Sequence, residues 1–301
     1  MDTNEIESIF NGIMVKDPNI SAGMAAIKTL LTVLREDTSA TIQELHFTFR
    51  TAIGIMKKSR FPVTAVASGC ELFMRFITLA ALDNKNFQQC KQVMLERGKL
   101  FFEKLNGARD KVAKLASAFI TDGSKILTHS KSRVVLQAMK EAVNTNKRFE
   151  VFVTTSAPDN SGREMCKELE KLNIPCTLIL DAAVGYIMES VDMVMLGAEG
   201  VVESGGIINK VGSYTMALCA RETSKPVYVL TESFKFVRLY PLNQRDLPAE
   251  FKYTFPHSEK DISKADPLVD YTPPIYITLL ITDLGILTPS AVSDELIKLY
   301  L

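Results

Sequence analysis

The chain has 301 residues with 35 basic and 35 acidic side chains, a net charge of zero and an apolar fraction of 47%. This length allows one large domain or two modest ones, and the composition is that of a globular protein rather than a disordered one. A dedicated nucleic-acid binder would normally carry a basic excess, so the charge balance argues against direct nucleic-acid binding. Because proteins near zero net charge tend to associate, the balance favours a protein that works in an assembly.

The sequence predicts a cytosolic protein without a membrane segment. No apolar run follows a basic N-terminus, and the longest apolar stretches are too short to span a bilayer. The five cysteines are widely spaced and contain no C-x-x-C pair. This pattern is more typical of reduced structural thiols than of a disulfide framework or a zinc site. We therefore expect no membrane partner and no metal.

Residues 1–120 predict an all-helical N-terminal domain. Asp17 and Pro18 interrupt the first helical pattern, and further breaks follow along the segment. Apolar side chains recur at the spacing of a helix in five successive segments, which are 6–14, 24–34, 41–56, 72–79 and 86–119.

Residues 121–301 predict an α/β domain. Short β-branched runs alternate with helical patterns, which indicates βαβ units and a parallel sheet covered on both faces. The expected strands are 126–128, 149–153, 176–180, 193–196, 227–230 and 276–281, and the expected helices are 134–143, 162–172, 182–188, 214–221 and a last helix capped by Thr288. The predicted fold class is a helical domain followed by a doubly wound, mostly parallel, Rossmann-like sheet.

The alternation stops between residues 232 and 274. This segment holds seven aromatic residues mixed with proline and charge, which argues against disorder. A loop of this length inside a compact domain is uncommon and is usually functional. Two interpretations stay open, a packed flap over the edge of the sheet and a surface that contacts another subunit.

Polar side chains follow several of the predicted strands. Ligands of doubly wound sheets bind beyond the carboxyl ends of the strands, and helix N-termini with serine and arginine suit an anionic group. We therefore expect a polar pocket for a phosphorylated, hydroxyl-rich ligand, although each residue alone also fits an ordinary structural role. The candidate residues are His129, Ser130, Ser132 and Arg133 after the first strand, Asp181 and Glu199 after later strands, and Asn209 and Lys210 before the next helix.

Several common catalytic motifs are missing from the sequence. It contains no G-x-x-x-x-G-K-[ST] loop, no G-x-G-x-x-G after the first strand, no H-E-x-x-H and no G-x-S-x-G. The sequence therefore does not predict nucleotide hydrolysis, zinc chemistry or ester hydrolysis, and no cofactor is expected.

Three motifs carry a resemblance to a known superfamily. They are T-H-S-K-S-R at 128–133, L-I-L-D-A-A-V-G-Y-I-M at 178–188 and G-A-E-G-V-V-E-S-G-G-I-I-N-K-V-G at 197–212. The superfamily unites the regulatory subunits of eukaryotic translation initiation factor 2B with methylthioribose-1-phosphate and ribose-1,5-bisphosphate isomerases. The resemblance covers almost the whole chain. Residues 232–248 and the C-terminal L-T-P-S-A-V-S-D-E-L-I-K-L-Y-L are most similar to the alpha-subunit branch.

Three departures from the isomerases lie around the expected pocket. The isomerases carry a cysteine in place of Ser130, an aspartate in place of Glu199, and E-T-R-P where residues 155–158 read T-S-A-P. Isomerisation needs groups that titrate near neutral pH, and an aliphatic hydroxyl without a base does not. The longer side chain of Glu199 displaces its carboxylate by roughly 1.5 Å. The resemblance thus implies that Ser130 and Glu199 are vestiges of a lost active site, in a protein that is not an enzyme.

The resemblance also implies partners. It predicts a regulatory subunit of the guanine nucleotide exchange factor for initiation factor 2, which forms a homodimer through the α/β domain. The homodimer would bridge complexes of the beta, gamma, delta and epsilon subunits and help to sense initiation factor 2 phosphorylated on its alpha subunit. The pocket would keep a sugar phosphate without turning it over. The alternatives are an active aldose–ketose isomerase and a free-standing small-molecule binding protein.

Overall fold

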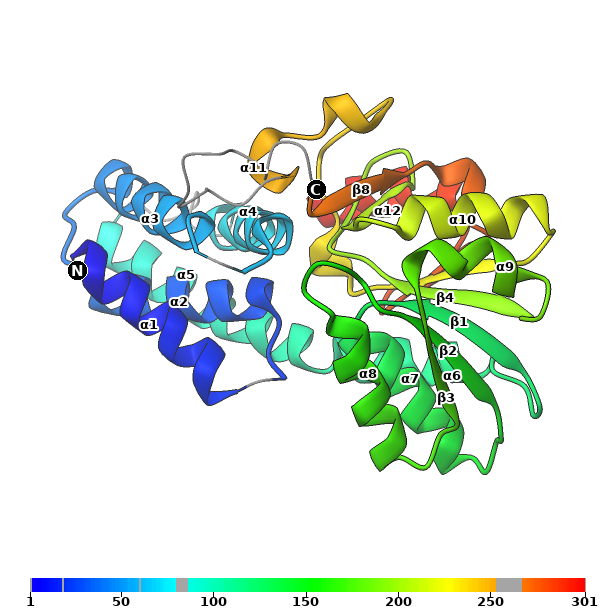
Figure 1. The fold of residues 1–301 in the computed structure, drawn as a ribbon. Helices are drawn as coiled ribbons and strands as arrows, with labels where there is room; N and C mark the ends of the chain where they lie inside the picture. The colour runs from blue at the N-terminus through cyan, green and yellow to red at the C-terminus, as the bar shows by residue number, and fades with distance from the viewer. Residues whose placement is uncertain (1, 18, 60, 80–85, 253–266, 301) are drawn as a thin grey trace. The chain divides into compact units, whose positions relative to one another are not determined.

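The computed structural model describes residues 2–17, 19–59, 61–79, 86–252 and 267–300. The chain divides into two compact units, one of Met1–Gly107 with Lys298–Leu301 and one of Ala108–Ile297 (Figure 1). Among the helices of these described ranges, none combines the length and the apolar character needed to cross a membrane.

The first unit is a bundle of helices. Helix α2 lies at its centre and packs against α1, α3, α4 and α5. Most of its residues are buried, which is typical of a helix that is apolar on nearly all sides. Its start is fixed by Ser21, whose hydroxyl accepts a hydrogen bond from the Met24 amide at 3.2 Å. The bounds are α1 Thr3–Lys16, α2 Ala22–Glu36, α3 Ile42–Lys57, α4 Val63–Leu79 and α5 Phe87–Asn106.

The boundary between the units falls at residue 107 rather than at residue 120. The single helical segment expected at 86–119 is two helices, because Gly107 ends α5 and a new helix, α6 (Ala108–Ser117), follows. Helix α6 packs on α7 of the second unit, and its Val112 and Ala116 are fully buried in that unit's core. Helical periodicity shows which face of α6 is apolar but not which core it joins.

The second unit is built on a seven-stranded sheet with the order β10-β9-β7-β4-β1-β2-β3. Every neighbouring pair is parallel except β9 and β10, so the predicted doubly wound, mostly parallel sheet is confirmed. The strands are β1 Lys125–His129, β2 Glu150–Thr154, β3 Cys176–Ile179, β4 Met193–Gly197, β7 Val227–Leu230, β9 Leu279–Thr282 and β10 Gly285–Leu287.

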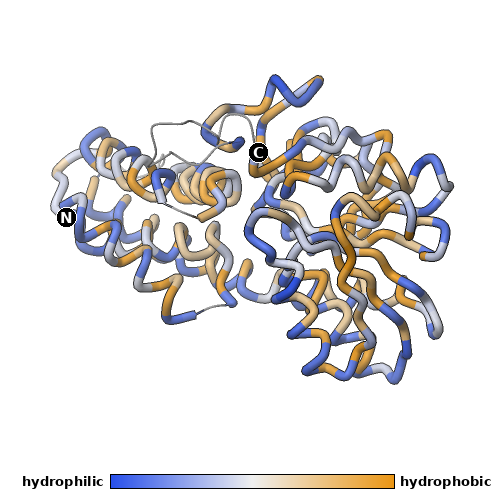
Figure 2. Tube along the Cα trace, viewed as in Figure 1, coloured by the Kyte–Doolittle hydropathy of each residue, from blue (hydrophilic) through white to orange (hydrophobic). Residues whose placement is uncertain are grey.

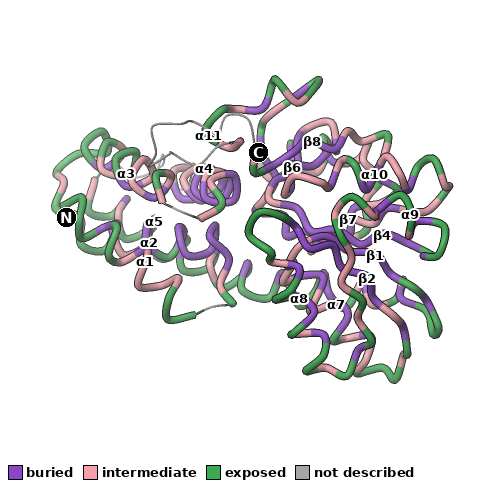
Figure 3. Tube along the Cα trace, in the orientation of Figure 1, coloured by how far each residue is buried: buried purple, intermediate pink, exposed green. Residues whose placement is uncertain are grey.

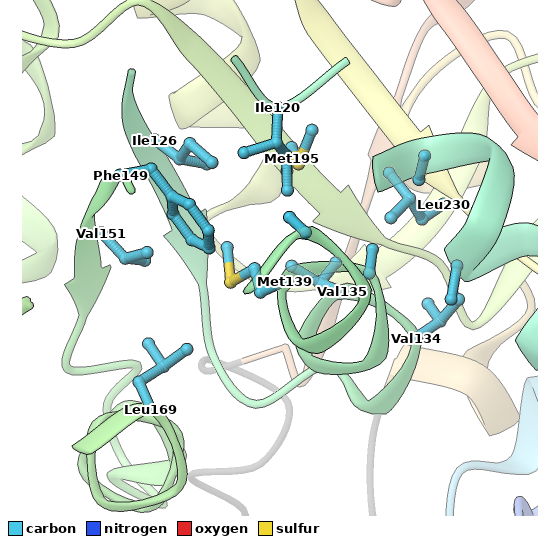
Figure 4. Close-up of a cluster of buried hydrophobic side chains, with 14 of the residues drawn as sticks. Ile120, Ile126, Val134, Val135, Met139, Phe149, Val151, Leu169, Met195 and Leu230 are labelled. Atoms are coloured by element: carbon cyan, nitrogen blue, oxygen red, sulfur yellow. The ribbon is translucent and has the colours of Figure 1, made fainter. Parts of the chain in front are cut away.

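Both faces of this sheet are buried under helices. Alternate residues of one strand enter different cores: Ile126 of β1 belongs to the cluster with α6, α7 and α8, whereas Leu127 belongs to the cluster with α9 and α10. The central strands are accordingly apolar along their length (Figure 2) and buried (Figure 3). Figure 4 shows the cluster that contains Ile126. The helices are α7 Arg133–Asn144, α8 Ser161–Lys171, α9 Val184–Met188 and α10 Ser213–Glu222.

A second, smaller sheet was not predicted. Its three antiparallel strands are β5 (Gly200–Val201), β6 (Ile207–Lys210) and β8 (Val269–Thr272). They are too short, and partly too polar, to produce a recognisable alternation. Asn209 and Lys210, expected before the next helix, lie on the strand β6, which pairs with β8.

The described part of the segment 232–274 packs inward at some positions, whereas Tyr240 and Leu242 are exposed. Phe234 and Phe236 are buried, and Val237 and Leu247 share a cluster with residues of the small sheet. This part also contains the short helix α11 (Ala249–Lys252). Residues 253–266, on which both interpretations also depended, lie outside the described residues.

The last helix starts later than predicted. Helix α12 spans Val292–Tyr300, after a 3₁₀ turn at Pro289–Ala291. Thr288 occupies the cap position of this turn, with Pro289 directly after it, but the Thr288 hydroxyl pairs with the Ser290 hydroxyl at 3.0 Å and forms no cap hydrogen bond.

Candidate functional site

The strand order of the large sheet reverses between β1 and β4, and ligands of doubly wound sheets bind at such a point. Ser132 caps α7 there by accepting a hydrogen bond from the Val135 amide, and the half-buried Arg133 is the first residue of the helix. Gly197 ends β4 so close to Ser132 that a Cβ at this glycine would overlap the serine hydroxyl. The N-terminus of α7 therefore lies directly at the switch point, where its amides favour an anion.

His129, the last residue of β1, is buried and holds three segments together. Its Nε2 donates to the Val211 carbonyl at 2.8 Å, so Nδ1 accepts from the Thr154 hydroxyl at 2.6 Å. Gly212 has a φ of +109° and lies against the ring, where a Cβ would be 2.9 Å from Cε1. Burial lowers the pKa of His129, against the opposing effects of the Val211 carbonyl and of Asp181. Both ring nitrogens have protein partners, so the imidazole holds the ends of β1 and β2 and the turn at Val211 together.

Asp181 fixes the loop that follows β2. Its carboxylate accepts from the amides of Ser156 at 2.9 Å and Ala157 at 3.0 Å, and from the Thr155 hydroxyl at 3.2 Å. It also lies 3.9 Å from Nδ1 of His129. The aspartate thus connects the ends of β1, β2 and β3 at one edge of the sheet.

Lys210 and Ser130 belong to one chain of polar contacts. The Lys210 ammonium forms an ion pair with Asp159 and donates to the Ser161 hydroxyl at 2.9 Å. The Ser161 hydroxyl in turn lies 2.7 Å from the Ser130 hydroxyl. Burial alone would raise the pKa of Asp159, but the hydrogen bonds from Lys210 and Ser161 and the charge of Lys210 together lower it. Segments far apart in the sequence, after β1, after β2 and at the end of β6, therefore meet here.

Glu199 adds a carboxyl group whose titration lies near neutral pH. It joins β4 to β5 and is half-buried, with its amide donating to the Ile208 carbonyl at 2.9 Å. Burial raises its pKa to about 7, although the nearby charges of Lys235 and Lys210 act in the opposite direction. The group can therefore carry or release a proton at neutral pH.

Asn209 is tied into the turn that leads to α10. Its amide donates to the Ser213 hydroxyl at 2.8 Å. Asp270, its partner across the ladder between β6 and β8, accepts from the amides of Gly212 at 2.7 Å and Tyr214 at 3.0 Å. Burial raises the pKa of Asp270 to about 7. This aspartate was missed because it lies in the segment where the strand pattern could not be recognised.

Asp159 and Ser161 were also missed, although both follow β2, the neighbour of β1. Their position after a parallel strand is the signal that indicates them, because ligands of doubly wound sheets bind beyond the carboxyl ends of the strands. Within the described ranges, no group of three or more His, Cys, Asp and Glu side chains is arranged to hold a metal ion.

Comparison with known proteins agrees with this architecture. The chain belongs to the initiation factor 2 subunit family, whose model matches residues 15–289. It is 41% identical over 305 residues to translation initiation factor eIF2B subunit alpha of Caenorhabditis elegans, with 100% of both chains covered. The predicted resemblance is thereby confirmed.

The chain is also similar to an isomerase and to a solved initiation-factor structure. It is 28% identical over 282 residues to the ribose 1,5-bisphosphate isomerase of Pyrococcus furiosus, covering 90% of this chain and 86% of the enzyme. The solved structure of the Pyrococcus horikoshii OT3 translation initiation factor eIF-2B superposes with a TM-score of 0.72 at 25% identity, covering 95% of this chain and 97% of that one.

Proposed function

We propose that this protein is the alpha-type regulatory subunit of the guanine nucleotide exchange factor for initiation factor 2, with a pocket that binds a sugar phosphate without converting it. The observation that supports binding without conversion is the environment of Ser130. Its hydroxyl pairs with the Ser161 hydroxyl, and the next group is the Lys210 ammonium. The Lys210 ammonium cannot remove the proton of a serine. The Asp159 carboxylate, which contacts Lys210 and Ser161, has a lowered pKa and is therefore a weak base. No strong base in this chain of contacts activates Ser130 as a nucleophile.

The same residues support the binding of a phosphate. Lys210 supplies a positive charge, and Arg133 stands at the start of α7, where helix amides favour an anion. A phosphate that reached Lys210 would replace Asp159 as the partner of its ammonium group. Asp159 therefore competes with the ligand, both for the lysine and through its own negative charge.

Calorimetry with ribose and hexose phosphates tests the pocket through two opposite changes. Lys210→Ala should weaken binding roughly 10- to 150-fold, because a charge-assisted hydrogen bond contributes about 1.5–3 kcal/mol. Asp159→Asn should tighten binding, because it removes the competing carboxylate and keeps the shape of the side chain. A general loss of stability cannot produce both results.

Two outcomes of that experiment contradict the proposal. The proposed binding of a sugar phosphate is contradicted if none of the sugar phosphates gives heat or a thermal shift with the unaltered protein. The assignment of residues is wrong if binding is present and Arg133→Ala and Lys210→Ala leave it unchanged.

The proposed role in the cell follows from the similarity to alpha subunits over the full length of the chain. We expect a cytosolic homodimer, formed through the α/β unit, that joins complexes of the beta, gamma, delta and epsilon subunits. It would contribute to the recognition of initiation factor 2 phosphorylated on its alpha subunit. The balanced charge of the chain suits a protein that buries surface against several partners.

A second candidate function, that of a sugar-phosphate isomerase, rests on Glu199. Its pKa of about 7 suits a general acid or base, and an isomerase is among the relatives. Incubation of the purified protein with ribose 1-phosphate and ribose 1,5-bisphosphate separates the two proposals. The appearance of a ketose phosphate that Glu199→Gln abolishes would favour the enzyme, whereas bound and unconverted ligand supports the regulatory subunit.

A further inference from the structure

Two cysteines of the second unit lie in direct contact. Cys166 is on α8, Cys176 is the first residue of β3, and their Sγ atoms are 2.6 Å apart. Both are free thiols, ten positions apart in the sequence. A disulfide has a bond length of about 2.05 Å, so these atoms need to approach by only roughly half an ångström to form one.

The contact follows from how α8 covers the edge of the sheet. The buried face of α8 is formed by Gly162, Met165, Cys166 and Leu169, which places Cys166 over the sheet. Cys176 pairs with Val151 of β2 in the parallel ladder, and β3 is the last strand on this side. Because main-chain hydrogen bonds hold β3 on one side only, its attachment depends on contacts such as this one.

We propose that Cys166 and Cys176 are a redox-sensitive pair that forms an intramolecular disulfide, locking the edge strand β3 to helix α8. The oxidant is a low-molecular-weight disulfide of the glutathione class. Disulfides in cytosolic proteins are rare and mostly have such a transient, redox-sensing role.

The reaction proceeds by two exchanges. Cys176 is half-buried and Cys166 is buried, so Cys176 meets the oxidant first. Its sulfur, once deprotonated, bonds to one sulfur of oxidised glutathione and expels one glutathione thiolate. The sulfur of Cys166, deprotonated in turn, then attacks Sγ of Cys176 and expels the second. Two protein thiols are oxidised, one glutathione disulfide is reduced, and the two protons end on the two glutathione molecules that leave.

The surroundings of the two cysteines determine how fast they are oxidised. Burial raises the pKa of both thiols, which keeps the thiolate fraction small at neutral pH. Oxidation is therefore slow, and the pair responds to a sustained change in redox poise rather than to a brief pulse of oxidant.

Equilibration of the full chain in buffers of defined ratios of reduced to oxidised glutathione tests the proposal. After thiol alkylation, the oxidised form should lack two of the five alkylation sites, and its unalkylated mass should fall by about 2 Da. A peptide map should join Cys166 to Cys176, and hydrogen exchange of the β3 amides should slow upon oxidation.

Variants supply the controls. Cys176→Ala should abolish the loss of 2 Da described above, and Cys219→Ala, which removes another half-buried cysteine, should retain it. If Cys176→Ala does not fold, the peptide map of the unaltered chain still decides. The proposal is overturned if all five thiols remain reactive at every ratio, if a stable glutathione adduct forms instead, or if the linked peptide contains a different cysteine.

Discussion

Replacing Glu232 by alanine is expected to destabilise the second unit by about 3–5 kcal/mol, because removing one partner of a buried ion pair leaves uncompensated charge. Glu232 is only 2% exposed. Its carboxylate lies 3.3 Å from Nε of Arg109 and 2.7 Å from Nζ of Lys235. The pair with Arg109 connects α6 to the segment after β7. Unfolding in urea, followed by circular dichroism, measures the loss.

The pH dependence gives this prediction a second readout. Burial alone would raise the pKa of Glu232, but Lys235 and Arg109 outweigh it and hold the pKa at about 2, below the ordinary value of 4.5. Because the folded pKa is the lower one, the stabilisation is complete above pH 4.5 and is lost as the pH falls toward 2. The alanine variant should lack this part of the acid-induced loss of stability.

Glu164→Ala is the matched control for Glu232→Ala. Glu164 also pairs with a lysine, Lys131, at 3.1 Å, but its side chain is 65% exposed. An exposed pair of this kind should change the free energy of unfolding by less than about 1 kcal/mol. Two results would contradict the stabilising role of the ion pairs of Glu232. One is an equal effect of the two alanine variants on the free energy of unfolding, and the other is an unchanged loss of stability at low pH in Glu232→Ala.

The second large effect is expected in the core beneath α7. Phe149→Ala should lower the free energy of unfolding by about 3–5 kcal/mol, because a large cavity replaces a buried ring. Phe149 is 6% exposed and belongs to the cluster that includes Ile126, Met139 and Val151 (Figure 4). Thermal and urea unfolding of the variant measure the change.

Tyr186→Ala serves as the control for the aromatic core. Tyr186 is 88% exposed, so its truncation should alter stability by no more than about 0.5 kcal/mol. A small effect of Phe149→Ala, similar to that of Tyr186→Ala, would mean that the cluster is not the core of this unit.

The large sheet could be predicted because its central strands are buried on both faces. Met193 to Leu196 and Val227 to Leu230 are apolar runs bounded by turns, and such runs indicate strands of a parallel sheet. The small sheet could not be predicted, because β5 has two residues and β6 ends in the polar pair Asn209 and Lys210. Local pattern is informative only where a strand is long enough to show it.

The position of the candidate site could be predicted, but its internal contacts could not. The carboxyl ends of parallel strands lie on one edge, which is why a rule based on strand order located His129 and Asp181. That both nitrogens of His129 have protein partners, and that Lys210 pairs with Asp159, depends on side chains that only the fold brings together. The contact between Cys166 and Cys176 has the same origin.

Sedimentation velocity of the purified chain, alone and mixed with the beta, gamma, delta and epsilon subunits of initiation factor 2B, tests the proposed regulatory role most directly. We expect a species of twice 33.4 kDa for the chain alone, and a larger complex that contains the chain together with the other subunits in the mixture. A chain that sediments at an unchanged rate when the other subunits are present would contradict it.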